Sequence, residues 1–350
     1  MNIKSLLLGS AAALVAVSGA RAADAVVIPE PEAVEYVRVC DAAGAGYLYI
    51  PGSETCLKIG GYVQYEISTG SGEIDIWTDE GPDGIFGSDD DVFETVEKSD
   101  GWNKNTEGRL TIDTYTDSDY GAVLTSFRLT TDLNFATVDE NGEISRAGLF
   151  VVDRANLTVA GLNMGLNASI FDFSATGAAD AEVGNRYGAF QVSYTASFGA
   201  NSFEIQLIDD PVYNYVPDVV VKASAEMGGM GLTGAIVYSD VTEGFGAKAT
   251  ATYGDFGAVI QYSDVELMGS EYEGSNQIVI GANYGVDLTE KLNVNLGGAY
   301  GFEDDDYGDA NWTIGAEAAY AATDTFTISA RARAMNDDDW DARMRFKVEY

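Results

Sequence analysis

The sequence contains no histidine among its 350 residues, and this absence limits the chemistry that the protein can perform. Histidine is the commonest general base of enzymes and a preferred ligand of transition metals. Catalytic arrangements that require it, such as the Ser-His-Asp triad and the Cys-His pair, are therefore excluded. Neither a nucleophile elbow nor a paired-acid motif stands out. The sequence thus predicts a protein that is not an enzyme, with no catalytic residues, no metal site and no cofactor.

Basic residues are also scarce, since 19 Lys and Arg face 56 Asp and Glu and give a formal charge of −37. Nucleic acid is excluded as a partner, because phosphate neutralisation needs clustered Lys and Arg. So large an excess of carboxylates would repel itself strongly within one soluble core. It is more easily accommodated in water-filled space or in long external loops.

The first 22 residues differ in composition from the rest of the chain. Lys4 precedes an apolar run from Leu6 to Val17, and Ala20-Arg21-Ala22 follows. This layout predicts a secretory signal peptide over residues 1–22, and the run is too short for a membrane anchor, which needs about 20 apolar residues. Without Lys4 and Arg21, residues 23–350 hold 17 basic and 56 acidic side chains, a formal charge of −39.

Long apolar runs are absent from residues 23–350, where no stretch approaches the length of a membrane-spanning helix, at least about 18 residues. Two cysteines, Cys40 and Cys56, lie in an N-terminal segment, residues 23–57. They suit one disulfide in an oxidising compartment such as the periplasm. The alternative is two unpaired cysteines in loops.

From Lys58 onward, apolar and polar residues alternate with a period of two, which indicates β-strands with two different environments. The final nine residues show the pattern most clearly. One face carries Ala342, Met344, Phe346, Val348 and Tyr350, and the other carries Arg343, Arg345, Lys347 and Glu349. Similar segments recur with roughly the 9 to 11 residues that a tilted strand needs to cross a bilayer. A soluble sandwich also alternates, but it turns its apolar side chains toward a core.

Short and long connections alternate between these segments. Short ones such as Gly161-Leu162-Asn163 and Gly254-Asp255 suit hairpin turns. Long ones cover residues 69–105, 136–153, 172–185, 209–217, 264–275 and 336–341. Aromatic residues recur near strand ends, as in the aromatic girdles of membrane barrels. Residues 58–350 are therefore predicted to form an all-β fold, a transmembrane antiparallel β-barrel of about 16 strands with short periplasmic turns and long external loops.

The most acidic stretch, residues 73–100, contains TDEGPDGIFGSDDD. Clustered Asp and Gly can bind Ca²⁺ through carboxylate and backbone oxygens. The spacing does not match an EF-hand, which favours a solvated acidic loop. Calcium binding stays an open alternative.

Four stretches resemble the general porins of rhizobial-type alphaproteobacteria. They are MNIKSLLLGSAAALVAVSGARAADAVV, EPEAVEYVRVCDAAGAGYLYIPGSETCLKIGGYVQY, RANLTVAGLNMGLNASIFDF and RMRFKVEY. The resemblance implies a 16-stranded barrel in the bacterial outer membrane, assembled as a homotrimer, through which small hydrophilic solutes diffuse. It also implies that Cys40 and Cys56 are the family's N-terminal cysteines. Tyr350 stands where Phe is more usual and still suits recognition of the C-terminal strand by the barrel-assembly machinery.

The resemblance further implies that the third external loop folds inward and narrows the pore. Candidate constriction residues are acidic on that loop and basic on the wall. The acidic set is Asp172, Asp180 and Glu182, and the basic set is Arg128, Arg331, Arg333, Arg343 and Arg345. Relatives often carry a basic residue after the fifth-strand glycine, whereas Leu166 follows Gly165 here. That difference and the excess of carboxylates predict a cation-selective pore.

The expected partners are outer-membrane lipids and lipopolysaccharide, together with the diffusing solutes. Two other kinds of barrel remain as alternatives. A structural or adhesive barrel would have a closed lumen and negligible conductance. A substrate-specific channel would conduct but would saturate with one solute.

Overall fold

The computed structural model describes most of the chain from residue 38 onward. The described residues are 38–71, 73–79, 92–97, 102–132, 136–138, 144–146, 149–179, 189–209, 216–239, 244–263, 278–302, 311–336 and 339–350. The predicted signal peptide and the candidate residues Asp180 and Glu182 lie outside them, as does much of the acidic stretch 73–100. Among the described residues, no helix has the length and apolar character needed to cross a membrane.

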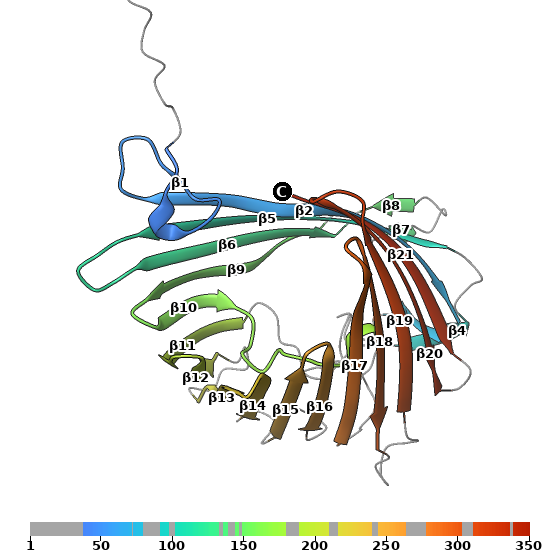
Figure 1. The fold of residues 1–350 in the computed structure, drawn as a ribbon. Helices are drawn as coiled ribbons and strands as arrows, with labels where there is room; N and C mark the ends of the chain where they lie inside the picture. Colours follow the sequence, from blue (N-terminus) through green and yellow to red (C-terminus); the bar gives the residue numbers. More distant parts are fainter. Residues whose placement is uncertain are drawn as a thin grey trace, which may run out of the picture. The chain divides into compact units, whose positions relative to one another are not determined.

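Sixteen antiparallel strands of the described chain close into one barrel (Figure 1). They are β2 (Cys56–Gly70), β5 (Asn103–Thr116), β6 (Val123–Asp132), β9 (Leu149–Val159), β10 (Leu162–Asn167), β11 (Ala189–Phe198), β12 (Asn201–Ile208), β13 (Asp218–Met227), β14 (Met230–Tyr238), β15 (Phe245–Tyr253), β16 (Phe256–Ser263), β17 (Ile278–Thr289), β18 (Leu292–Gly301), β19 (Asn311–Ala321), β20 (Phe326–Met335) and β21 (Trp340–Glu349). The predicted fold and strand number are confirmed.

The barrel closes where β2 pairs with β21 on one side and with β5 on the other. Two backbone hydrogen bonds extend this seam, one from Gly61 N to Tyr350 O and one from Tyr350 N to Gly61 O, each 3.1 Å long. A closed barrel leaves neither β2 nor β21 as a free sheet edge, as a membrane-spanning sheet requires.

Smaller elements are not among the sixteen strands of the barrel wall. They are η1 (Asp41–Ala43), β1 (Leu48–Tyr49), the hairpin of β3 (Glu73–Asp79) and β4 (Val92–Glu97), the hairpin of β7 (Ala136–Val138) and β8 (Ile144–Arg146), and η2 (Gly177–Ala179). The two hairpins fall within the predicted long connections 69–105 and 136–153, which the sequence reasoning treated as loops only.

The alternation places apolar side chains outside and charged ones inside, as predicted. Met344 and Val348 of β21 are exposed on the outer surface. Arg345, between them in the sequence, forms an ion pair with Glu66 of β2 within the barrel. Successive side chains of a strand point to opposite faces, so this pattern assigns one face of every strand to lipid and the other to the lumen.

Short turns join the strands at the periplasmic end, where the chain must reverse within two residues. The β9–β10 turn uses Gly161 at φ +84°, and the β15–β16 turn uses Gly254 at φ +56°. Glycine adopts these left-handed conformations without the steric cost of a Cβ. The longer external connections join strand ends at the opposite end of the barrel.

A disulfide joins Cys40 to Cys56, so the predicted pairing is confirmed. Cys56 is the first residue of β2, and both cysteines are buried. The backbone N–H of Cys40 donates to the carbonyl oxygen of Tyr47 at 2.9 Å. The bridge thus ties the segment before the barrel directly to its first strand.

Candidate pore constriction

The connection from β10 to β11 turns into the barrel instead of away from it. Its described part, residues 168–179, is called the inward loop below. Figure 1 shows this segment running along the interior from β10 toward β18. Phe171, Ala175, Ala178 and Ala179 of the inward loop are buried although none lies in a strand. The predicted inward folding of the third external loop is therefore confirmed.

The near end of the inward loop is fixed to the wall by Gln206 of β12. Its Oε1 accepts a hydrogen bond from the backbone N–H of Ile170 at 2.8 Å, and its Nε2 donates to the carbonyl oxygen of Ala168 at 3.1 Å. Gln206 is almost completely buried by these contacts. A buried amide paired on both sides is a stable and specific attachment.

The far end of the inward loop, which contains η2, lies against β17 to β20. Asn295 Oδ1 accepts a hydrogen bond from Ala178 N at 2.7 Å, and Arg333 Nη1 donates to Ala179 O at 3.2 Å. Two wall glycines, Gly297 and Gly315, provide the space for this approach. A Cβ on Gly297 would overlap Thr176 O, and one on Gly315 would overlap Ala178 O.

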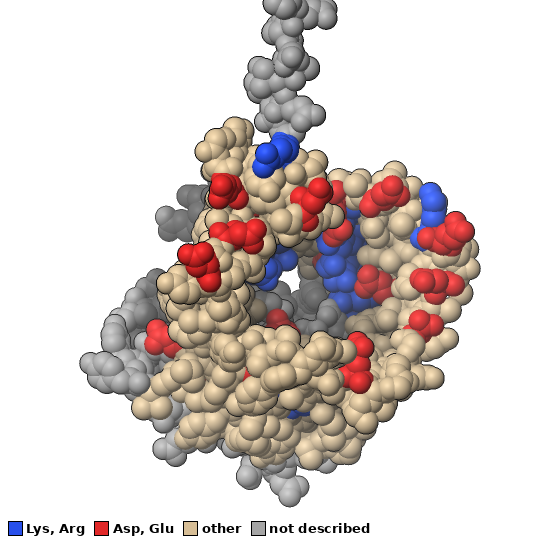
Figure 2. Space-filling model, turned by 60° about the vertical axis from the view of Figure 1, so that its left-hand side comes forward, with Lys and Arg blue, Asp and Glu red and all other residues tan. Residues whose placement is uncertain are grey.

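All five predicted basic wall residues lie on the inner faces of their strands, where Arg128, Arg333, Arg343 and Arg345 form ion pairs with wall carboxylates. Arg128 Nε is 2.6 Å from Asp153 Oδ1, and Arg333 Nε is 2.9 Å from Asp341 Oδ2. Arg343 lies 3.2 Å from Glu317, and Arg343 and Arg345 share Glu66 at 3.6 and 2.9 Å. Arg331 lies directly opposite Arg343 in the β20–β21 register. Figure 2 shows Lys and Arg side chains inside the opening with carboxylates among them.

Sequence reasoning missed the acidic partners of these arginines and two further arginines. Arg109 of β5 pairs with Glu107 at 3.4 Å, and Arg154 of β9 lies opposite Arg128 in register. Alternation could have placed Arg109 and Glu107 on one face of β5. It could not have paired Arg128 with Asp153, because a register shift between β6 and β9 brings that carboxylate to the inner wall.

The structure places one of the three predicted acidic residues. Asp172 is half-buried on the inward loop, and its backbone N–H donates to Ser169 O at 3.1 Å. Asp180 directly follows η2 in the sequence, and Glu182 comes two residues later, but both lie outside the described residues. Their position in the pore is therefore a proposal.

Leu166 does not bear on the charge of the lumen, so this part of the sequence prediction is wrong. Leu166 pairs in register with Phe190, which is 65% exposed on the outer surface. Residues opposite each other in adjacent strands share a face, so Leu166 also faces lipid. A basic side chain there would lie outside the pore, and its absence says nothing about selectivity.

A closed barrel with an apolar exterior, a charged interior and a loop folded within it defines a membrane channel with a constricted lumen. A family model described as "Porin subfamily" matches residues 24–349. The chain belongs to this porin family. It is an outer-membrane β-barrel channel and not an enzyme.

The curated relatives agree in sequence over nearly the whole chain. Porin Omp2b of Brucella neotomae is 34% identical over 363 aligned positions, covering 94% of this chain and 91% of the relative. Porin Omp2b of Brucella suis is 33% identical, with 97% and 85% covered. These relatives support membership in an alphaproteobacterial porin family.

Solved structures share the fold at much lower identity. OmpF of Salmonella typhi, solved in complex with daunomycin, has a TM-score of 0.59 at 14% identity, covering 86% of this chain and 99% of that one. The outer membrane channel DcaP of Acinetobacter baumannii has a TM-score of 0.55 at 14% identity, again covering 86% and 99%. At such identities the likeness supports the barrel fold alone.

Proposed function

We propose that this porin is a homotrimeric channel for passive diffusion of ions and small hydrophilic solutes, with a preference for cations. Membership in the porin family supports the trimer. The observation that carries the cation preference is the pairing of the wall arginines with carboxylates, because paired arginines attract anions only weakly. Diffusion through such a channel needs no energy source.

Acidic residues of the wall match these paired arginines in number. Arg128, Arg333, Arg343 and Arg345 face Asp153, Asp341, Glu317 and Glu66. A paired charge contributes little net potential at a distance, because the fields of the two partners largely cancel. The formal charge of −39 over residues 23–350 already counts these arginines, and setting the four pairs aside leaves it unchanged.

Much of the remaining acid lies in the connections at the external end of the barrel. Residues 303–310 alone contain one Glu and four Asp, and they join the ends of β18 and β19. Negative potential near a channel mouth concentrates cations and repels anions. Within the pore, Asp172 together with Asp180 and Glu182 would add acidic groups opposite the arginine wall.

The proposed channel must also be exported and inserted into the outer membrane. Residues 1–22 serve as a signal peptide that is removed before assembly. The apolar face of β21, with Met344, Phe346 and Val348, is recognised by the barrel-assembly machinery and then contacts lipids and lipopolysaccharide.

Reversal potentials across a planar bilayer test the ion preference directly. Under a salt gradient, the unmodified channel should give a potential of the sign expected for cation permeation. The preference should be larger near 0.1 M salt, where the Debye length is roughly 10 Å, than near 1 M, where it is about 3 Å. A potential of the opposite sign at 0.1 M would refute cation selectivity while leaving the channel itself intact.

A further inference from the structure

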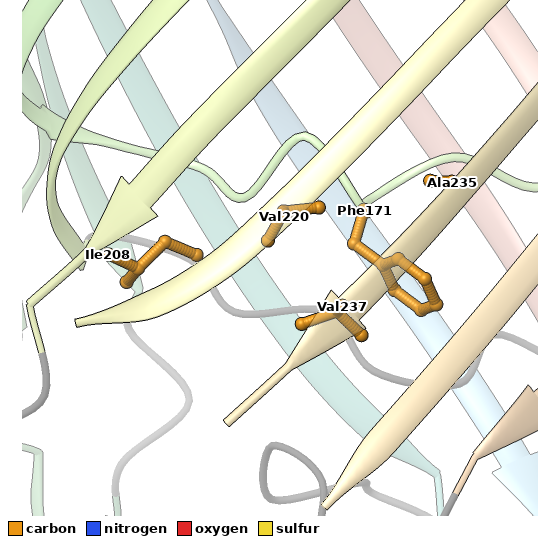
Figure 3. Close-up of a cluster of buried hydrophobic side chains, with 5 residues drawn as sticks. All are labelled: Phe171, Ile208, Val220, Ala235 and Val237. Carbon is orange, nitrogen blue, oxygen red and sulfur yellow. The ribbon is translucent and has the colours of Figure 1, made fainter. Parts of the chain in front are cut away.

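The inner wall carries an apolar patch although the lumen around it is polar and charged. The patch consists of Ile208 of β12, Val220 of β13, and Ala235 and Val237 of β14, all of them buried. Figure 3 shows Phe171 of the inward loop lying among these side chains. Apolar side chains exposed to water are unfavourable, so the patch stabilises the docked position of the loop.

Lys248 of β15 lies beside this patch and is only 4% exposed. A lysine is rarely buried so deeply unless other groups compensate its charge. Its Nζ donates a hydrogen bond to Phe171 O at 3.1 Å. The same Nζ lies 4.7 Å from the ring centroid of Phe171 and 5.3 Å from that of Phe173, within the range of cation–π attraction.

These three contacts join one wall residue to both neighbours of Asp172. The rings of Phe171 and Phe173 also meet edge to face, with centroids 6.3 Å apart and planes at 66°. The same ammonium group therefore holds the loop on each side of Asp172, through the backbone carbonyl and ring of Phe171 and through the ring of Phe173. Directional contacts at two consecutive points restrict the loop more than apolar burial does, because burial tolerates sliding.

We propose that Lys248 is a positioning residue for the constriction: it clamps the inward loop to the wall and thereby sets the open area of the pore and the steadiness of its current. This inference concerns pore size and fluctuation. It therefore stands independently of the proposed cation preference.

The far end of the inward loop has its own attachments, and these limit how much of the loop moves when Lys248 is replaced. Asn295 and Arg333 hold residues 178 and 179 through contacts that do not involve Lys248. Gln206 likewise keeps residues 168 and 170 attached to β12 without Lys248. Loss of the Lys248 clamp should therefore release the middle of the loop, around residues 171–173, while both ends stay docked. The result should be a pore that is wider on average and that fluctuates as this middle part moves.

Lys248→Met tests this inference, because Met keeps an unbranched apolar side chain and removes both the charge and the donor. Lys222→Met of β13 is the matched control. Lys222 and Lys248 both pair in register with Ala235, so they share one row of the inner face. Lys222 forms its ion pair with Glu204 of the wall, at 3.0 Å, and not with the inward loop. The control removes the same charge without removing the clamp.

Single-channel recording near 1 M salt separates these effects, since charge is then screened over about 3 Å. Lys248→Met should raise the conductance, the open-channel current noise and the size limit for neutral polymers. Lys222→Met should change none of them, and Lys248→Arg should largely restore the unmodified behaviour. A folded Lys248→Met channel that is as quiet and as narrow as the unmodified one would overturn the proposal, as would the same change in Lys222→Met.

A second variant covers the case in which Lys248→Met yields no folded barrel. Phe173→Leu removes one of the two rings and leaves the hydrogen bond from Lys248 to Phe171 in place. It should raise the current noise with a smaller change in mean conductance. Unchanged noise in folded Phe173→Leu would count against the clamp.

Discussion

Gly297 of β18 lies directly opposite Gly315 of β19 in the strand register, and together they form the surface on which η2 rests. The carbonyl oxygens of Thr176 and Ala178 occupy the space that Cβ atoms would fill at these two positions. Because Gly297 and Gly315 have no side chains, η2 can lie against the wall and narrow the pore at this point.

Gly297→Ala should displace η2 from the wall, because the new methyl group would overlap the backbone of the inward loop at Thr176 and Ala178. Backbone atoms, unlike the end of a flexible side chain, cannot give way without moving η2. Gly298→Ala is the matched control on the next residue, where a Cβ would have its nearest neighbour at 3.6 Å, on Ile314. Single-channel conductance should change in the first variant only. Equal conductance in both folded variants would show that η2 does not contribute to the constriction.

Asp180→Asn with Glu182→Gln should lower the cation preference and leave folding intact. Both residues belong to the connection between β10 and β11, so the substitutions alter no residue of a barrel strand. The measurement is the reversal potential at 0.1 M salt, where screening is weak. An unchanged potential in the double variant would remove these two residues from the constriction.

Phe346→Asp should reduce the yield of folded barrel, because it places a charge on the lipid face of β21. Phe346 lies opposite Tyr65 of β2 and Ile328 of β20, within the apolar exterior. The cost near the membrane midplane is about 2 kcal/mol. Thr327→Asp is the control, because Thr327 faces Lys347 on the inner side of the same strand pair. Heat-modifiable mobility in gels reports the folded fraction, and equal yields from both variants would contradict the assignment of faces.

Cys40→Ser should loosen the segment before β2 without opening the barrel. The bridge closes a loop with a sequence separation of 16, for which chain entropy predicts a stabilisation of about 3 kcal/mol. The ladders of β2 with β5 and β21 do not depend on it. Limited proteolysis should then cut between residues 41 and 55 while the remaining barrel resists. Cleavage within the barrel strands at the same rate would contradict this separation.

The barrel could be predicted from sequence because its pattern is local. A period of two along Met344, Arg345 and Phe346 assigns faces without knowledge of any partner strand. The same rule made the Leu166 inference fail, since a step of one residue moves a side chain from the lumen to the lipid. Gly165 faces the lumen opposite Gln191, whereas Leu166 faces lipid opposite Phe190.

The attachment of the inward loop was missed because it depends on residues far apart in sequence. The available signal was a departure from the pattern: Ile208, Val220 and Val237 place apolar side chains on the inner face. Such residues indicate that something covers the wall, but they do not identify Phe171 as the cover. Arg343 pairs with both Glu66 and Glu317, and this requires β19, β20, β21 and β2 to be in register. Composition does not predict that register.

The seam between Gly61 and Tyr350 constrains the order of events during biogenesis. While β21 is still missing, β2 can form its ladder with β5 but presents its other edge unpaired, and such edges invite pairing with foreign chains. Until β21 pairs with β2, the exported polypeptide therefore keeps this edge exposed. Escort proteins in the periplasm would have their greatest effect in that interval, and an interrupted chain would never complete the ring.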